Sequence, residues 1–307
     1  MSDTNTRHVA FLGLGNMGAR MARRLVDAGH DVVGFDPVES ARNALTEAGG
    51  RAEPSAAGAI TGAATVILML PNSAVVEAIL EDPAVVAALQ PGMTVVDMSS
   101  SDPMSTRRLA DRLAARGIAL VDAPVSGGVS GAEAGTLTIM AGGSVDAVVA
   151  VEKVLAPMGT PRRIGDCGAG HAIKAINNLL AAVHLLATAE GYAAGLRFGL
   201  DPEVIVSTIN AASGRSASTE IKFPKFVVPE TYDSGFALAL MLKDMRTATG
   251  LAAELGVPAV LGECAVGLWS AADADLGPGA DQTEIARWVR DGSARATTSS
   301  ASVHQAP

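Results

Sequence analysis

The stretch "HVAFLGLGNMGARMARRL" (residues 8–25) decides the fold, because it joins an apolar run, a glycine-rich turn and an amphipathic segment. Its glycines have the G-x-G-x-x-G spacing. In such a turn the first glycine permits a tight bend, the second lets the backbone approach a pyrophosphate, and the third packs helix on strand. The start of the helix then offers free N–H groups to phosphates. We expect a dinucleotide site formed by Gly13, Leu14, Gly15, Asn16, Met17 and Gly18; a glycine-rich turn without a ligand is the alternative.

An acidic residue ends the next apolar run, about 20 residues further on, where a dinucleotide site receives the adenosine ribose. Asp36 in "VVGFDP" occupies that place. A carboxylate accepts hydrogen bonds from two ribose hydroxyls and repels a 2′-phosphate, which favours NAD over NADP. Arg42 could still approach the ribose, so NADP stays open, and Asp36 could instead cap a helix beside Pro37.

Short apolar runs alternate with amphipathic segments through the first half of the chain, a pattern typical of β-α units in a parallel sheet. The predicted strands span residues 8–14, 31–36, 65–70, 94–99, 119–125 and 137–142. The predicted helices span residues 16–28, 38–48, 72–80, 103–116 and 144–156. From about residue 168 onward, Ala- and Leu-rich helical periods replace the strand pattern. The fold class is therefore α/β, a doubly wound parallel sheet of Rossmann type followed by an all-helical domain.

The Gly- and Pro-rich segment "MGTPRRIGDCGAG" (158–170) marks the boundary between these halves. We predict a Rossmann domain over residues 1–167 and a helical domain for substrate binding and oligomerisation over 168–291. The segment 292–307 is poor in large apolar residues, which predicts a disordered tail.

Composition narrows the function classes. The 307 residues have a net charge of −9 and no basic run, which argues against binding to nucleic acid or an anionic membrane. The N-terminus resembles no signal peptide, and the purely apolar stretches, such as "VILML" (66–70), are too short to cross a bilayer. Cys167 and Cys264 form neither a disulfide framework nor a metal-ligand spacing. We expect a soluble, cytoplasmic protein that acts on small molecules, with no metal site.

A single lysine interrupts the apolar segment "HAIKAINNLLAAVHLL" (171–186). On a helix, His171, Lys174 and Asn178 share one face, separate from an apolar stripe. An amine desolvated there has a lowered pKa and can take the proton of a substrate hydroxyl while the carbon gives hydride to nicotinamide. Asn178, one turn further on, could hold the substrate or the lysine by hydrogen bonds. The alternative is a lysine that extends to solvent, and His171 and His184 are better explained as packed or capping residues.

A second glycine-rich segment, "DAPVSGGVSGAEAGTLTIMAGG" (122–143), follows a strand at the edge of the sheet where ligands of open α/β folds bind. Ser126, Gly127 and Gly128 would offer a hydroxyl and backbone N–H groups to a substrate carboxylate. Ordinary turn chemistry is the alternative.

Four segments together resemble the β-hydroxyacid dehydrogenase family, from about residue 7 to residue 290. They are "GLGNMGARMARRL" (13–25), "DAPVSGGVSGAEAGTLTIMAGG" (122–143), "GAGHAIKAINNLL" (168–180) and "LMLKDMRTATGLAAELGVP" (240–258). The resemblance implies NAD(P)-dependent interconversion of a small 3-hydroxy acid and its semialdehyde. It also implies a long interdomain helix that begins near Gly168, and a homodimer or homotetramer.

The resemblance assigns roles residue by residue. Lys174 matches the catalytic lysine and Asn178 the substrate-positioning asparagine, while Ser126, Gly127 and Gly128 match the carboxylate loop. The remaining matches are to the cofactor site: Leu70, Pro71, Ser100 and Lys243. "MSSSD" departs from the family's usual form, which leaves the choice among Ser99, Ser100 and Ser101 open. From the residues alone, Pro71 could end a strand, Ser100 could cap a helix, and Lys243 could be a surface charge paired with Asp244.

Two other classes compete with this interpretation. A non-catalytic dinucleotide-binding sensor would have no need of Lys174, and an imine reductase would have a different residue there. A phosphorylated sugar acid would need a cationic cluster. Arg215 is one candidate, but the sequence indicates no cluster, so a non-phosphorylated acid is favoured. The particular 3-hydroxy acid is not apparent from the sequence.

Overall fold

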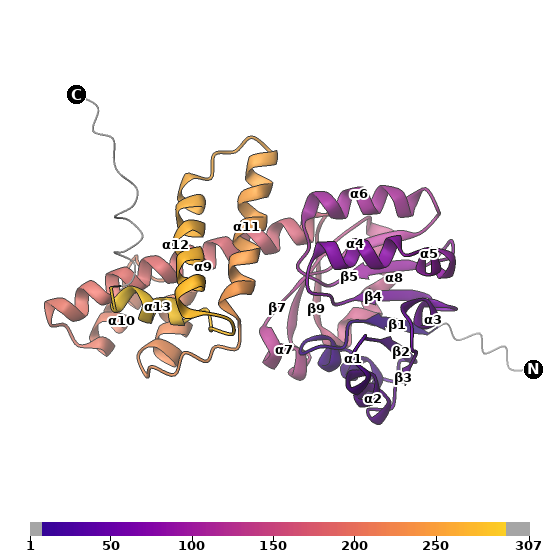
Figure 1. Ribbon diagram of the computed structural model, residues 1–307, viewed down its shortest axis with the longest axis horizontal. Coiled ribbons are helices and arrows are strands. Elements are labelled where there is room, and N and C mark those ends of the chain that lie inside the picture. Colours follow the sequence, from indigo (N-terminus) through magenta and orange to yellow (C-terminus); the bar gives the residue numbers. More distant parts are fainter. Residues whose placement is uncertain (1–7, 293–307) are drawn as a thin grey trace, which may run out of the picture. The chain divides into compact units, whose positions relative to one another are not determined.

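The computed structural model describes residues 8–292, so the predicted tail lies outside the described residues from residue 293 onward. Two compact units make up the chain, divided between Lys174 and Ala175. The division falls within the long helix α9 (Ala169–Phe198). Figure 1 labels the helices and strands of each unit.

A nine-stranded sheet forms the centre of the first unit. Its order is β3-β2-β1-β4-β5-β6-β8-β7, with β9 paired to β8. The strands are β1 (Val9–Leu12), β2 (Val32–Phe35), β3 (Arg51–Ala52), β4 (Thr65–Leu68), β5 (Thr94–Asp97), β6 (Ala119–Asp122), β7 (Val125–Ser126), β8 (Leu137–Gly142) and β9 (Gly159–Gly165). The strands from β3 to β6 pair in parallel, as predicted for a Rossmann sheet.

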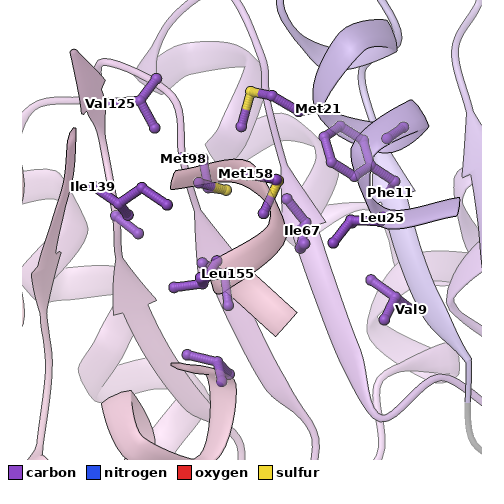
Figure 2. Packing of buried hydrophobic residues seen from close by; sticks show 14 of the residues in the cluster. Val9, Phe11, Met21, Leu25, Ile67, Met98, Val125, Ile139, Leu155 and Met158 are labelled. Carbon is purple, nitrogen blue, oxygen red and sulfur yellow. The ribbon is translucent and has the colours of Figure 1, made fainter. Parts of the chain in front are cut away.

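Helices cover both faces of this sheet, because alternate residues of each strand enter different cores. On β1, Val9 and Phe11 join one core, and Ala10 and Leu12 join the other. The first core (Figure 2) includes residues of α1 (Gly18–Asp27), α2 (Glu39–Glu47), α7 (Gly128–Ala134) and α8 (Val145–Leu155). The second includes residues of α3 (Ala56–Ile60), α4 (Ser73–Glu81), α5 (Pro83–Ala88) and α6 (Pro103–Ala114), of which α4, α5 and α6 lie along one side of the sheet in Figure 1.

The far edge of the sheet is less regular than the sequence pattern predicts. β8 runs antiparallel to β6 and β7, and β9 runs parallel to β8. β9 lies inside the segment 158–170, for which the sequence predicts a domain boundary and no strand. In the pairing of β8 with β9, Leu137 lies opposite Gly159. A Cβ on residue 159 would lie 2.0 Å from Leu137 O, so this pairing requires glycine there.

The second unit is helical, as predicted from residue 168 onward. After α9 it contains α10 (Pro202–Asn210), the π-helical segment η2 (Ser218–Val227), α11 (Leu238–Glu254), α12 (Val260–Leu276) and α13 (Glu284–Arg290). Phe223, Leu238, Met245, Trp269 and Ile285 are fully buried in its core. An isolated β-bridge pairs Ala237, directly before α11, with Asp281, shortly before α13.

Helix α9 is unusual in its apolar surface. Among the described residues it is the one helix long and apolar enough to cross a membrane, with a mean hydropathy of 1.4 in an 18-residue window of which 28% is buried. Length and composition alone are weak evidence for a membrane span, since a helix of a soluble protein passes the same test. Exposed apolar side chains of this extent mark a surface that another molecule can cover.

Candidate active site

The glycine-rich turn after β1 is shaped as a phosphate-binding loop. Gly13 has a φ of +95°, and a Cβ there would lie 2.2 Å from Met69 O. A Cβ on Gly18 would lie 1.9 Å from Gly13 O, so the start of α1 packs directly on the turn. A Cβ on Gly15 would meet nothing within 4 Å, which leaves its backbone open to a ligand. These three environments fit the roles that the dinucleotide motif gives to its glycines.

Asp36 lies buried at the end of β2, beside this turn. Its Oδ2 accepts a hydrogen bond from Leu14 N at 2.8 Å, and its Oδ1 accepts one from Val38 N at 2.8 Å. Each carboxylate oxygen keeps a second lone pair with which to accept from a ribose hydroxyl. Arg42 donates to the backbone oxygens of Asp36 and Pro37, at 2.7 and 3.2 Å. Val38, not Asp36, is the N-cap of α2, so Asp36 does not cap that helix.

The ends of β4 and β5 are joined by serine hydroxyls. Leu70 N donates to Ser99 Oγ at 2.9 Å, and Ser101 Oγ donates to Asp97 Oδ2 at 2.7 Å. Ser99 and Ser101 are buried, whereas Ser100 between them is half-buried. Asp102 caps α6, so Ser100 is not the cap of that helix. Pro71 is exposed in the turn between β4 and α4.

The order of the strands explains why these segments lie close together. β1 is flanked by β2 and β4, so the chain reverses its direction of travel across the sheet between β1 and β4. Ligands of open α/β sheets bind outside the carboxyl ends of the strands at this switch point. The glycine turn, Leu70, Pro71 and Ser100 all follow the carboxyl ends of β1, β4 and β5.

The predicted carboxylate loop follows the next strands. Ser126 ends β7 and is half-buried, and Gly127 and Gly128 have φ values of +131° and +63°. Such backbone angles favour glycine. A Cβ on Gly128 would meet nothing within 4 Å, so this turn is open on one side.

Lys174 lies in the second turn of α9 and has 8% of its surface exposed. The start of the helix is fixed by Asp122, whose carboxylate accepts from Gly168 N at 2.7 Å and from His171 N at 2.8 Å. A carboxylate at this end also matches the helix dipole. The burial on α9 is the reverse of an ordinary amphipathic pattern: Lys174 and Asn178 are buried, whereas Ile173 and Ile176 are 39% and 41% exposed.

In the second unit a carboxylate joins two of the predicted site residues. Asn178 Nδ2 donates to Asp244 Oδ2 at 2.6 Å, and Lys243 Nζ lies 3.0 Å from Asp244 Oδ1. Asp244 is buried, whereas the Lys243 side chain is 30% exposed. The sequence identified Asp244 only as a possible surface partner of Lys243. Its hydrogen bond with Asn178 joins α11 to α9. The two residues are far apart in the sequence, so no local sequence pattern predicts this contact.

A cavity of about 380 Å³ lies along α1 and α2, away from these groups. Four alanines, Arg20 and Arg24 are among the residues that line it. It shares only Leu14 with the predicted cofactor residues, so it is not the candidate active site.

Comparisons with known proteins identify the class. Residues 8–174 match a family model described as the NAD binding domain of 6-phosphogluconate dehydrogenase. Residues 168–289 match one described as NAD-binding of NADP-dependent 3-hydroxyisobutyrate dehydrogenase. The two matches together span the two halves that the sequence predicts.

Individual relatives agree with the family models. 2-(Hydroxymethyl)glutarate dehydrogenase of Eubacterium barkeri is 40% identical, over 81% of this chain and 82% of its own. NAD-dependent L-serine dehydrogenase of Pseudomonas aeruginosa is 39% identical, over 86% and 91%. The structure of Mycobacterium tuberculosis 3-hydroxyisobutyrate dehydrogenase with L-serine has a TM-score of 0.88 at 34% identity, covering 92% of this chain and 99% of that one.

The fold and these matches define an NAD(P)-binding oxidoreductase with a Rossmann sheet and a helical second half. The chain belongs to the β-hydroxyacid dehydrogenase family. The predictions of the family, the fold class, the enzyme class and the cofactor type are thereby confirmed.

Proposed function

We propose that this enzyme interconverts a small, non-phosphorylated 3-hydroxy acid and its semialdehyde, with Lys174 as the general acid and base. The observation that carries the proposal is the burial of Lys174 in the helix that Asp122 attaches to the end of β6. The family relationship supplies the reaction class.

The side chains of this protein have defined tasks in that reaction. In the oxidising direction, Lys174 Nζ takes the hydroxyl proton of the substrate while the carbon below gives up a hydride. Nicotinamide, when bound, supplies the hydride acceptor. The hydroxyl of Ser126 and the N–H groups of Gly127 and Gly128 hold the substrate carboxylate, and Asn178 holds the substrate beside the lysine.

The cofactor residues are those of the sheet edge. Backbone N–H groups of the Gly13–Gly18 turn, including Asn16 and Met17, bind the pyrophosphate. Leu70, Pro71 and Ser100 border the nicotinamide half, and the family resemblance assigns Lys243 to cofactor binding as well. Ser100 is proposed from its place in the family motif, and it lies between Ser99, whose Oγ accepts from Leu70 N, and Ser101, whose Oγ donates to Asp97 Oδ2.

We infer that NAD is preferred over NADP. Asp36 is buried and ionisable where the 2′-phosphate of NADP would lie, and Arg42 is engaged with backbone oxygens. The positive group nearest the ribose is therefore directed at the protein, not at a phosphate.

The names of the relatives suggest the substrate class. L-Serine, 3-hydroxyisobutyrate and 2-(hydroxymethyl)glutarate each have a primary alcohol on the carbon next to the one that bears the carboxylate. We propose a substrate with this hydroxymethyl group. A screen of such acids with NAD and NADP, followed by absorbance of the reduced cofactor, identifies it.

Lys174→Ala is the decisive variant. If the proposal is correct, it abolishes turnover and leaves NADH affinity, measured by fluorescence, unchanged. A non-catalytic sensor predicts no turnover by the unaltered chain with any hydroxy acid. Imine reduction by the unaltered chain at a rate above that of alcohol oxidation would favour the imine reductase.

We further propose a soluble, cytoplasmic homodimer or homotetramer. Large apolar side chains are exposed on the helical unit, among them Leu180, Phe198, Val204, Val260 and Leu261. A second copy of the chain would cover them. Sedimentation at micromolar concentration tests this, and a monomer contradicts it.

A further inference from the structure

His171 is completely buried one turn before Lys174 on α9. The sequence explains it only as a packed or capping residue. Its imidazole contacts two other parts of the first unit, the segment directly after β5 and helix α6. Nε2 lies 3.1 Å from the carbonyl oxygen of Ser99, and Nδ1 lies 2.8 Å from Thr106 Oγ1. A carbonyl oxygen can only accept, so a hydrogen bond in the first contact requires the tautomer that carries a proton on Nε2.

Two buried carboxylates surround the same ring. Asp97 Oδ2 lies 3.8 Å from Nε2, and Asp122 Oδ2 lies 3.9 Å from Nδ1. Asp97 also accepts from Ser99 N at 3.0 Å, so it orders the backbone that the imidazole contacts. Asp122 accepts from the backbone N–H of His171 itself. The residue is therefore held at its backbone by the end of β6 and at its side chain by the end of β5.

This arrangement connects Lys174 to the cofactor edge of the sheet. The carbonyl oxygen of Ser99 contacts the imidazole, and the hydroxyl of Ser99 accepts a hydrogen bond from Leu70 N. Ser99 also precedes Ser100. A displacement of the imidazole would therefore change the position of Lys174 relative to the ends of β4 and β5. Misplacement of a reacting group by about 1 Å can lower a rate by about 100-fold.

We propose that His171 is a positioning residue, which fixes the Lys174 turn of α9 to the Ser99 end of β5 through the Nε2 hydrogen bond. The inference rests on the proposed role of Lys174. It does not require the imidazole to touch substrate or cofactor.

Two substitutions separate this role from simple space filling. In His171→Gln the amide nitrogen lies about as far from Cα as Nε2, so donation to Ser99 O is kept. In His171→Asn the shorter amide reaches only the position of Nδ1, so that donation is lost. His184→Asn, at an exposed histidine of the same helix, is the matched control.

The expected result is a split between the variants. His171→Asn lowers kcat by about 10- to 100-fold, with NADH Kd within about threefold of the unaltered enzyme, whereas His171→Gln keeps kcat within about fivefold. His184→Asn has no effect. Equal losses in both His171 variants that follow their thermal stability would overturn the inference, as would no loss in either.

A second readout does not depend on activity. Crystal structures of the variants should show Lys174 Nζ displaced relative to Ser99 in His171→Asn and unmoved in His171→Gln. An unmoved lysine in His171→Asn refutes the positioning role. If the unaltered enzyme oxidises no hydroxy acid, the proposed function fails, and these structures still decide whether His171 places Lys174.

Discussion

The side-chain amide of Asn178 donates from Nδ2 to Oδ2 of Asp244 across 2.6 Å, and both residues are buried. Because a carboxylate can only accept, the amide nitrogen must face Asp244. Asn177 donates to the amide oxygen of Asn178 at 3.2 Å. The other oxygen of Asp244 lies 3.0 Å from Lys243 Nζ. One carboxylate thus orients both the proposed substrate-binding amide and the proposed cofactor-binding amine.

Asp244→Asn should lower kcat/KM by about 10- to 100-fold, because hydrogen bonds to a buried charge contribute about 1.5–3 kcal/mol. The KM values for both the hydroxy acid and NAD should rise, since Asn178 and Lys243 lose the same partner. Steady-state kinetics with each substrate varied in turn measure this. Asp275→Asn makes the same change at a carboxylate that accepts from Trp288 Nε1, and it should leave both KM values unchanged.

Asp36→Asn should narrow the preference for NAD. The amide keeps an acceptor for Leu14 N or Val38 N, but it no longer repels a 2′-phosphate. We expect the ratio of kcat/KM with NAD to that with NADP to fall about tenfold or more, which corresponds to about 1.4 kcal/mol. An unchanged ratio would mean that Asp36 does not face the ribose.

The sequence predicted the sheet because its strands are short apolar runs at β-α spacing. Six of the nine strands correspond to predicted ones, and β3, β7 and β9 were not predicted as separate strands. β9 has the sequence "GTPRRIG", with no apolar alternation, and it forms through pairing with β8, a contact made in three dimensions. The short helices α3, α5 and α7 were also missed, since few residues give too little periodicity.

The candidate site could be predicted where residues are consecutive or evenly spaced. The glycine turn, Asp36 and the Lys174–Asn178 face belong to this group. The roles of Asp244, Asp97, Asp122 and Ser99 could not be predicted, because each depends on which distant elements the fold brings together. His171 is an intermediate case: its face was predicted, but its partners were not.

The two cysteines should differ in reactivity. Burial raises the pKa of the Cys167 thiol to about 12, and the Asp122 carboxylate adds to the increase. Cys264 is exposed. Since the thiolate is the nucleophile, iodoacetamide at about pH 8 should modify Cys264 in the folded enzyme and leave Cys167 unmodified. Peptide mass spectrometry shows the difference. Equal modification of both in the folded state would contradict the burial of Cys167, and denaturation should make both reactive.

Burial of Lys222 makes the stability of the folded protein depend on pH. Burial lowers the pKa of its amine from 10.5 to about 8, and Asp281 opposes the shift only in part. Between these pH values the unfolded chain binds more protons than the folded chain, so the free energy of unfolding rises with pH through this window. Below about pH 8 the full cost of burying the charge is present.

Lys222→Met removes this contribution. The free energy of unfolding of the unaltered protein, minus that of the variant, should increase by about 2 kcal/mol between about pH 8 and pH 10. All other titrating groups are shared, so the difference isolates the lysine. Urea unfolding followed by helical circular dichroism measures it. A difference that stays constant with pH would show that the amine titrates as it does in the unfolded chain.

Two glycines of α9 should respond to alanine in opposite directions. A Cβ on Gly170 would lie 2.1 Å from Met140 O and 2.9 Å from Asp122 O, both backbone atoms of the sheet. The helix cannot accommodate a methyl group there without moving away from β6 and β8. Gly170→Ala should therefore destabilise the protein by about 2 kcal/mol or more and lower kcat, because the Lys174 turn moves with the helix start.

Gly191, in the exposed part of the same helix, is the matched position. A Cβ there would meet nothing within 4 Å. Gly191→Ala should raise the free energy of unfolding by about 0.5–1 kcal/mol, since alanine loses less backbone entropy on helix formation. It should not alter kcat. Thermal unfolding and steady-state rates of the two variants test both signs together. A loss of kcat in Gly191→Ala, or no loss in Gly170→Ala, would contradict the link between the start of α9 and Lys174, the proposed general acid and base.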